Sequence, residues 1–216
     1  RNDLIYLERK GVIKRLFGKA VLLEESLLPT FDLNNIKNLN EKEKIGKYAA
    51  SLIKDDESVM LYTGTTTLQV ARYMDNSKNI IVVTNSIYIA YELSKKPNIK
   101  TVFIGGNLNP DTGSTYGGQA IHQLNEYKID KLFVAVEGID AEMGITNDQP
   151  YETDINRAMI EKANQVIVVA DYSKIGATHF VSMGEIEDID ILITDSKAPM
   201  DKIESIRSRG VEVIIV

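Results

Sequence analysis

Residues 57–74, ESVMLYTGTTTLQVARYM, decide the fold of this chain. Residues 58–62 form a short apolar run with a β-branched valine, which is typical of a buried strand. Leu68, Ala71 and Met74 then recur at helical spacing, which predicts a helix that begins among the threonines. The sequence therefore predicts a strand that turns through Gly64 into a helix.

Such a turn offers a site for an anion. The first amide N–H groups of a helix have no partner inside the helix, and the helix dipole adds partial positive charge at the same end. The hydroxyls of Thr65, Thr66 and Thr67 add donors there. We predict that these threonines bind a phosphate together with Thr63 and Gly64. A capped turn is an equally good interpretation of this stretch alone, because threonine is an ordinary N-cap residue.

The composition excludes several other kinds of site. The 216 residues include no cysteine, which rules out disulfides and thiolate metal sites. The two histidines, His122 and His179, lie far apart without ligand spacing, so we expect neither a metal nor a cofactor. The longest apolar runs fall short of the roughly 18 residues of a membrane span, and we expect a cytoplasmic protein.

Runs rich in valine and isoleucine alternate with helical patterns along the chain. Besides the first strand, we expect strands at residues 80–84, 100–105, 131–136, 165–170, 190–194 and 211–216, with helices at 86–95, 119–127, 153–163 and 200–209. Another helix precedes residue 57, with Asn40 as N-cap and Glu43 as its capping-box partner. Residues 106–117 and 137–150 are expected to be long loops. This order predicts an α/β fold, with a mostly parallel open sheet covered by helices on both faces.

Polar residues and glycines follow the predicted strands. Because ligands of open α/β sheets lie beyond the carboxyl ends of the strands, these positions are candidates for binding the rest of a phosphorylated polyol. The candidates are Asn85, Gly105, Gly106, Glu137, Asp140 and Lys174. Each also has a simpler interpretation: Asp140 as a turn cap, the glycines for their backbone angles, Lys174 as a solvated charge.

The N-terminal residues differ in charge from the rest. Residues 1–20 hold six basic and two acidic side chains, whereas the whole chain carries a net charge of −6. A helical pattern over residues 3–10 and an alternating, hairpin-like pattern over 12–18 together predict the second half of a winged helix. Arg1, Asn2, Lys14 and Arg15 are the candidate DNA contacts, although a solvated basic helix face is a common alternative. The chain opens without methionine inside a helical pattern, so we expect the natural protein to begin earlier.

Several of these stretches, in register, resemble one protein family. RNDLIYLERKGVIKRLFGKAV is similar to the end of the DNA-reading helix and the wing of DeoR-family bacterial regulators, with departures at Asn2 and Lys19. TGTTTLQVA, VVTNS, FIGG, IDKLFVAVEGID, MGIT, ADYSKIG and ITD resemble the sensor domain of that family. The resemblance implies a truncated winged helix over residues 1–20, a linker over 21–39 and a sugar-phosphate sensor over 40–216.

The resemblance also implies a fold related to ribose-5-phosphate isomerase and the coenzyme A transferases. The expected function is a repressor of sugar metabolism genes that is controlled by a phosphorylated sugar. The expected partners are this effector, operator DNA bound through the complete N-terminal domain, and further copies of the chain in a homodimer or homotetramer, with no membrane.

A sugar-phosphate isomerase is the alternative. Isomerases of this fold carry Asp-Gly-Ala-Asp-Glu followed by a lysine and a run of glycines. Here Glu137 and Asp140 occupy the matching stretch, but residues 141–149 contain neither the lysine nor the glycine run. Isomerisation needs a positioned base and donors for the developing oxyanion, so we expect a regulator without catalytic residues.

Overall fold

The computed structural model describes residues 13–16, 19–22 and 37–216. The chain divides into two compact units, residues 1–36 and 37–216. In the first unit, β1 (Ile13–Leu16) pairs antiparallel with β2 (Lys19–Leu22). The predicted hairpin is therefore present, but its second strand lies later than residues 12–18. The helix predicted over residues 3–10 lies outside the described residues.

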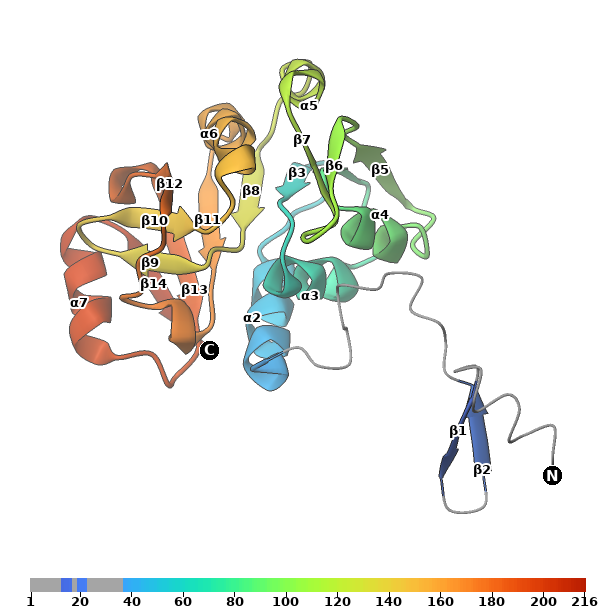
Figure 1. The fold of residues 1–216 in the computed structure, drawn as a ribbon, viewed down its shortest axis with the longest axis horizontal. Coiled ribbons are helices and arrows are strands. Elements are labelled where there is room, and N and C mark those ends of the chain that lie inside the picture. Colours follow the sequence, from blue (N-terminus) through green and yellow to red (C-terminus); the bar gives the residue numbers. More distant parts are fainter. Residues whose placement is uncertain (1–12, 17–18, 23–36) are drawn as a thin grey trace. The chain divides into compact units, whose positions relative to one another are not determined.

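A seven-stranded parallel sheet runs through residues 37–216, in the order β14–β13–β11–β8–β3–β4–β5 (Figure 1). Its strands are β3 (Ser58–Leu61), β4 (Ile80–Thr84), β5 (Ile99–Phe103), β8 (Lys131–Val134), β11 (Val166–Val169), β13 (Ile191–Thr194) and β14 (Glu212–Ile215). All seven predicted strands are confirmed, with ends that match the prediction to within two residues.

Helices cover both faces of this sheet, as predicted. The helices on one face are α2 (Leu39–Ser51), α3 (Thr65–Tyr73) and α4 (Ile87–Leu93), and those on the other are α5 (Gly118–Leu124), α6 (Thr153–Lys162) and α7 (Met200–Ser208) (Figure 1). Strands β8, β11 and β13 are buried along their whole length because side chains on both of their faces meet helices. Met60 and Leu132 of the sheet pack in one core cluster with Met159 of α6 and Ile203 of α7. This double cover explains the continuous apolar runs in the sequence.

Both predicted long loops contain strands, so that prediction is wrong. β6 (Asn107–Asn109) and β7 (Ser114–Tyr116) form an antiparallel hairpin. β9 (Gly138–Asp140) and β10 (Gly144–Asn147) join β12 (Val181–Gly184) in a three-stranded sheet. These strands are short and partly polar, so their apolar patterns are too brief to stand out from loops. Three single 3₁₀ turns complete the description: η1 (Pro150–Glu152), η2 (Tyr172–Lys174) and η3 (Ile186–Asp188).

The start of α2 also differs from the prediction. The helix begins at Leu39 after Asn38, which has a left-handed backbone with φ 55°. The side-chain Nδ2 of Asn38 donates to Asp171 Oδ1 at 2.9 Å, so a long-range contact holds this end of the helix. The capping box of Asn40 and Glu43 is therefore wrong, since Asn40 already lies within the helix. Among the described residues, no helix combines the length and the apolar character needed to cross a bilayer.

Candidate functional site

The turn after β3 has the geometry that an anion site needs. Gly64 has φ 154°, and a Cβ atom on it would lie 2.4 Å from Ala135 Cβ at the end of β8, so the position favours glycine. The first helical bond runs from Leu68 N–H to Gly64 O at 3.0 Å. The amides of Thr65 and Thr66 therefore precede the bonded part of α3 and remain available to a ligand.

The threonine hydroxyls are less available than the sequence led us to expect. Thr67 Oγ1 donates to Gly64 O at 3.0 Å and closes the turn. Thr63 Oγ1 donates to Thr112 O at 3.2 Å in the β6–β7 hairpin. Thr66 is buried, and Thr65 is partly exposed. The donors of this turn are thus mainly backbone amides, and the expectation that all three hydroxyls of Thr65–Thr67 are free is wrong for Thr67.

Two lysines lie near the carboxyl end of β11. Lys174, in the 3₁₀ turn η2 after β11, forms an ion pair with Glu137, which follows β8. Lys42, in the first turns of α2, lies 3.5 Å from Asp171 through its Nζ and is buried. Burial lowers the pKa of Lys42, and the charge of Asp171 counteracts this while that of Lys174 adds to it. The structure therefore groups two ammonium groups with two carboxylates.

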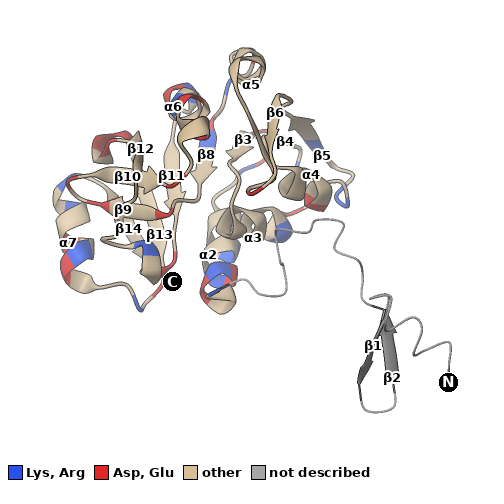
Figure 2. Cartoon of the chain, in the orientation of Figure 1, with Lys and Arg blue, Asp and Glu red and all other residues tan. Residues whose placement is uncertain are grey.

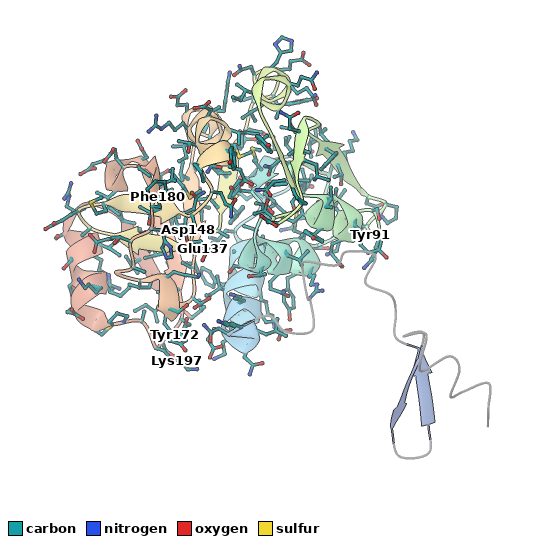
Figure 3. The ribbon with its side chains drawn as sticks, in the orientation of Figure 1. Tyr91, Glu137, Asp148, Tyr172, Phe180 and Lys197 are labelled. Atoms are coloured by element: carbon teal, nitrogen blue, oxygen red, sulfur yellow. The ribbon has the colours of Figure 1, made fainter. Side chains whose placement is uncertain are left out.

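The order of the strands places these two lysine–carboxylate pairs at the same sheet edge as the turn after β3. Strands β11, β8 and β3 are adjacent and parallel, so their carboxyl ends lie along one edge. Gly64 rests on Ala135, two positions before Glu137. On the helix side, α2 packs on α3 so closely that a Cβ on Gly46 would lie 2.5 Å from Gln69 Cβ. Figure 2 shows basic and acidic residues together on α2, and Figure 3 shows Glu137 where the chain passes from β8 to β9.

Asp171 anchors this edge of the molecule. Its Oδ1 accepts from Ser173 N at 3.1 Å, from Ser173 Oγ at 2.6 Å and from Asn38 Nδ2 at 2.9 Å. Burial alone would raise the pKa of Asp171, but the Ser173 hydrogen bonds and the Lys42 charge outweigh it, and the pKa is lowered. Asp171 is therefore a fixed anion that holds α2 and Lys42 against the end of β11.

Three other predicted site residues, Asn85, Gly105 and Gly106, make contacts within the fold. Asn85 is fully buried and donates through Nδ2 to Thr115 O at 3.0 Å. Gly105 N–H donates to Gln123 Oε1 at 3.0 Å, and a Cβ on Gly106 would lie 2.6 Å from Tyr116 O. Both glycines thus serve the packing of β7 and α5. Asn85 retains one acceptor, because its Oδ1 has no hydrogen-bond partner among the described residues.

The structure does not bring Asp140 to the lysines. Its Oδ1 accepts from Glu142 N at 2.9 Å, so it caps the turn between β9 and β10. It lines a separate hollow of about 200 Å³ with Gly176 and Lys202. This arrangement matches the simpler interpretation of Asp140 as a turn residue.

Glu152 is a buried acid whose setting the sequence does not reveal. Its side chain is fully buried and accepts from Asn109 Nδ2 at 2.9 Å, Thr112 Oγ1 at 2.9 Å, Ser114 Oγ at 2.6 Å and the Tyr62 hydroxyl. Burial raises the pKa of the Tyr62 phenol well above its usual range, and the Glu152 charge adds to the effect. The carboxylate thus fastens the β6–β7 hairpin to the end of β3. Its donors come from distant segments, so no local spacing marks it.

Lys42 was also missed, because only the packing of α2 places it beside Asp171.

Of the candidate DNA contacts, Arg1 and Asn2 lie outside the described residues. Lys14 and Arg15 lie in β1, opposite Val21 and Ala20 of β2. In the part of the chain that the structure describes, no group of three or more His, Cys, Asp or Glu residues is arranged to hold a metal.

Comparisons with known proteins identify the family of this chain. The family model of the DeoR C-terminal sensor domain matches residues 37–196. The chain is 35% identical over 219 residues to the putative aga operon transcriptional repressor of Escherichia coli O157:H7, covering 100% of this chain and 81% of that protein. It is 37% identical over 216 residues to the HTH-type transcriptional repressor GlcR of Bacillus subtilis strain 168, covering 100% and 83%.

A solved structure shows the same fold. The probable sor operon regulator of Shigella flexneri matches with a TM-score of 0.50 at 12% identity, over 82% of this chain and 90% of that chain. The family match covers most of the unit that holds the sheet, including the turn at Gly64. The chain therefore belongs to the DeoR family of transcription regulators and carries the sensor domain of that family over residues 37–196.

Proposed function

We propose that this chain is the effector-sensing part of a repressor of sugar metabolism genes, and that a phosphorylated sugar binds at the carboxyl edge of its sheet. One observation carries the proposal. The open helix N-terminus at Thr65 lies at the same sheet edge as two ammonium groups, Lys42 and Lys174, which come from separate elements. Such convergence of N–H donors and cations is suited to a phosphate dianion.

The chemistry of the edge divides into two parts. The amides at the start of α3 and the ammonium group of Lys174 neutralise the phosphate, and each charge-assisted contact stabilises the complex by about 1.5–3 kcal/mol. Glu137, with half of its side chain exposed, supplies an acceptor for sugar hydroxyls. Binding of the phosphorylated sugar is therefore expected to be far tighter than binding of the free sugar.

The names of the relatives support a role in gene regulation. Both curated relatives reported above are named as transcriptional repressors. We extend the proposal to operator DNA, which the complete N-terminal domain would bind through a helix and wing that include Arg1, Asn2, Lys14 and Arg15. A homodimer or homotetramer would present two or more such domains to a symmetric operator.

Calorimetry of the chain with sugar phosphates tests the effector. The panel includes phosphates of fructose, tagatose, deoxyribose, inositol and an amino sugar, each beside its free sugar. At least one phosphate ester should bind a hundredfold or more tightly than its free sugar, since about 2.7 kcal/mol corresponds to that ratio. Equal binding of ester and free sugar would contradict the site. Turnover of any ester at about 1 per second or faster would favour an isomerase-like enzyme instead.

Gel shifts test the DNA partner. A regulator of this family with a complete N-terminal DNA-binding domain should bind a specific operator at moderate salt. Residues 21–216 serve as the control. Tight and sequence-specific binding by this control would rule out the wing as the DNA contact.

A further inference from the structure

The two lysine–carboxylate pairs of the site differ in burial and in the number of their partners. In the Lys42–Asp171 pair the side chains are 9% and 1% exposed, and Asp171 also accepts from Ser173 and Asn38. In the Lys174–Glu137 pair the side chains are 25% and 52% exposed. Among residues 37–216, Lys174 is the one side chain that bonds to the Glu137 carboxylate. The first pair is therefore fixed, and the second can exchange partners.

The side-chain charges of the site cancel one another. Two ammonium groups face two carboxylates, so an approaching phosphate meets only the partial charge of the α3 N-terminus. Lys174 gives its full charge to a phosphate only when Glu137 turns away, because two anions beside one ammonium repel each other. Glu137 can turn toward solvent at small cost, since half of its side chain is already exposed and exposed ion pairs are weak.

We propose that Glu137 determines the specificity of this site by competing with phosphate for Lys174. The inference rests on the proposed function and adds a selection step to it. Inorganic phosphate displaces Glu137 from Lys174 but carries no sugar hydroxyls that could donate hydrogen bonds to the displaced carboxylate. A sugar phosphate displaces the same carboxylate and then donates its hydroxyls to it, and hydrogen bonds to an ionised acceptor are the stronger kind. The carboxylate thus opposes simple phosphates and favours esters that carry hydroxyls near the phosphate.

Glu137→Gln tests this inference, because it removes the charge and keeps the shape. The probes are inorganic phosphate, methyl phosphate and fructose 6-phosphate, measured by calorimetry at about pH 8, where phosphate monoesters are dianions. We expect the variant to bind methyl phosphate and inorganic phosphate about threefold to tenfold more tightly than the wild type, the range that loss of a weak ion pair allows. The affinity for fructose 6-phosphate should rise less than that for methyl phosphate, or should fall. The preference of the site for fructose 6-phosphate over methyl phosphate is therefore smaller in the variant.

Two matched variants separate competition from general electrostatics. Glu142→Gln removes the same charge from an exposed position in the β9–β10 turn and should leave all three affinities unchanged. In a Lys174→Met background, Glu137→Gln should no longer raise the affinity for methyl phosphate, because the increase depends on the charge of Lys174. The unfolding midpoints of the single variants serve as the check on folding.

The possible results distinguish the two proposals. If the wild type binds phosphate esters and Glu137→Gln leaves methyl phosphate binding unchanged or weaker, the role of Glu137 is wrong and the phosphate site stands. If the gain persists without Lys174, or Glu142→Gln gives the same gain, competition for Lys174 is wrong. If neither the wild type nor the variant binds any of the three probes, both the phosphate site and the role of Glu137 fail.

Discussion

Glu152 and Glu137 lie in the same connection between β8 and α6, yet their surroundings give them opposite properties. Glu152 is fully buried and accepts from four side chains, including Asn109 and the Tyr62 hydroxyl. Glu137 is half exposed and pairs with Lys174. A carboxylate whose acceptor positions are filled by the protein holds the fold together, whereas one with a single weak partner can respond to a ligand. Burial and the number of partners, rather than residue type, separate scaffold from site.

Removal of the Glu152 carboxylate should give the largest effect on stability. Glu152→Leu removes the buried acceptor that Tyr62, Asn109, Thr112 and Ser114 share. It deletes four hydrogen bonds to one carboxylate, and we expect a loss of about 4 kcal/mol in the free energy of unfolding. Glu152→Gln keeps one acceptor oxygen and should lose less than half as much. Urea denaturation measures both. A loss below about 1 kcal/mol in the leucine variant would show that the network does not stabilise the fold.

Gly64→Ala tests whether the turn itself belongs to the scaffold. A methyl group at Gly64 lies 2.4 Å from Ala135 Cβ, and the backbone has φ 154°, so we expect a loss of about 3 kcal/mol. Gly118→Ala is the matched control, since a Cβ there has no described atom of its surroundings within 4 Å. Thermal unfolding should separate the two variants clearly. Equal midpoints would mean that the turn relaxes without strain.

Lys174→Met probes the exchangeable side of the comparison. It keeps the apolar stem and removes the charge, so a sugar phosphate found in the panel should bind tenfold to a hundredfold more weakly, about 1.4–2.7 kcal/mol. Unfolding should change by less than about 1 kcal/mol because the ion pair is partly exposed. Lys100→Met, on an exposed position of β5, is the control for calorimetry. Unaltered affinity in Lys174→Met would remove this lysine from the site.

The fixed pair of Asp171 and Lys42 should show its effect through pH. Because the pKa of Asp171 is lowered in the folded protein, its ionised form stabilises the fold above the unfolded pKa of about 3.9. This contribution is lost as the pH falls through the lower folded value. The gap in stability between the wild type and Asp171→Asn should be about 1 kcal/mol at neutral pH and shrink below about pH 4. A stability difference that grows as the pH falls would show that ionised Asp171 does not stabilise the fold.

The elements that could be predicted from sequence are those whose pattern is local. Most strands of the main sheet are apolar runs, and the Gly64 turn joins one of them to a helix. The strands β6, β7, β9, β10 and β12 were missed because each mixes polar residues or glycine with few apolar ones and depends on partners that the local pattern does not identify.

The candidate site divides in the same way. The turn, Glu137 and Lys174 could be named because they directly follow strands in the sequence. Lys42 and Glu152 could not, because the partners that define them, Asp171 and the hairpin residues, are brought to them only by tertiary packing. Asp140 follows the strand-end rule but serves its own turn. Position at a strand end is thus a useful indicator of a site residue and an incomplete one.

The pairing of β3 with β8 has a consequence for when the sensor becomes competent during synthesis. β3 lies next to β8 in the sheet, and Tyr62 N–H donates to Phe133 O at 3.1 Å, although the whole β4–α5 segment separates them in sequence. A ribosome that has reached residue 130 has already made Thr63–Thr67, but neither Ala135, which supports Gly64, nor Lys174 yet exists. Closing such distant pairs is slow relative to local contacts. Sensing therefore begins only after the second half of the domain has been made and folded, so an unfinished chain does not compete for the effector.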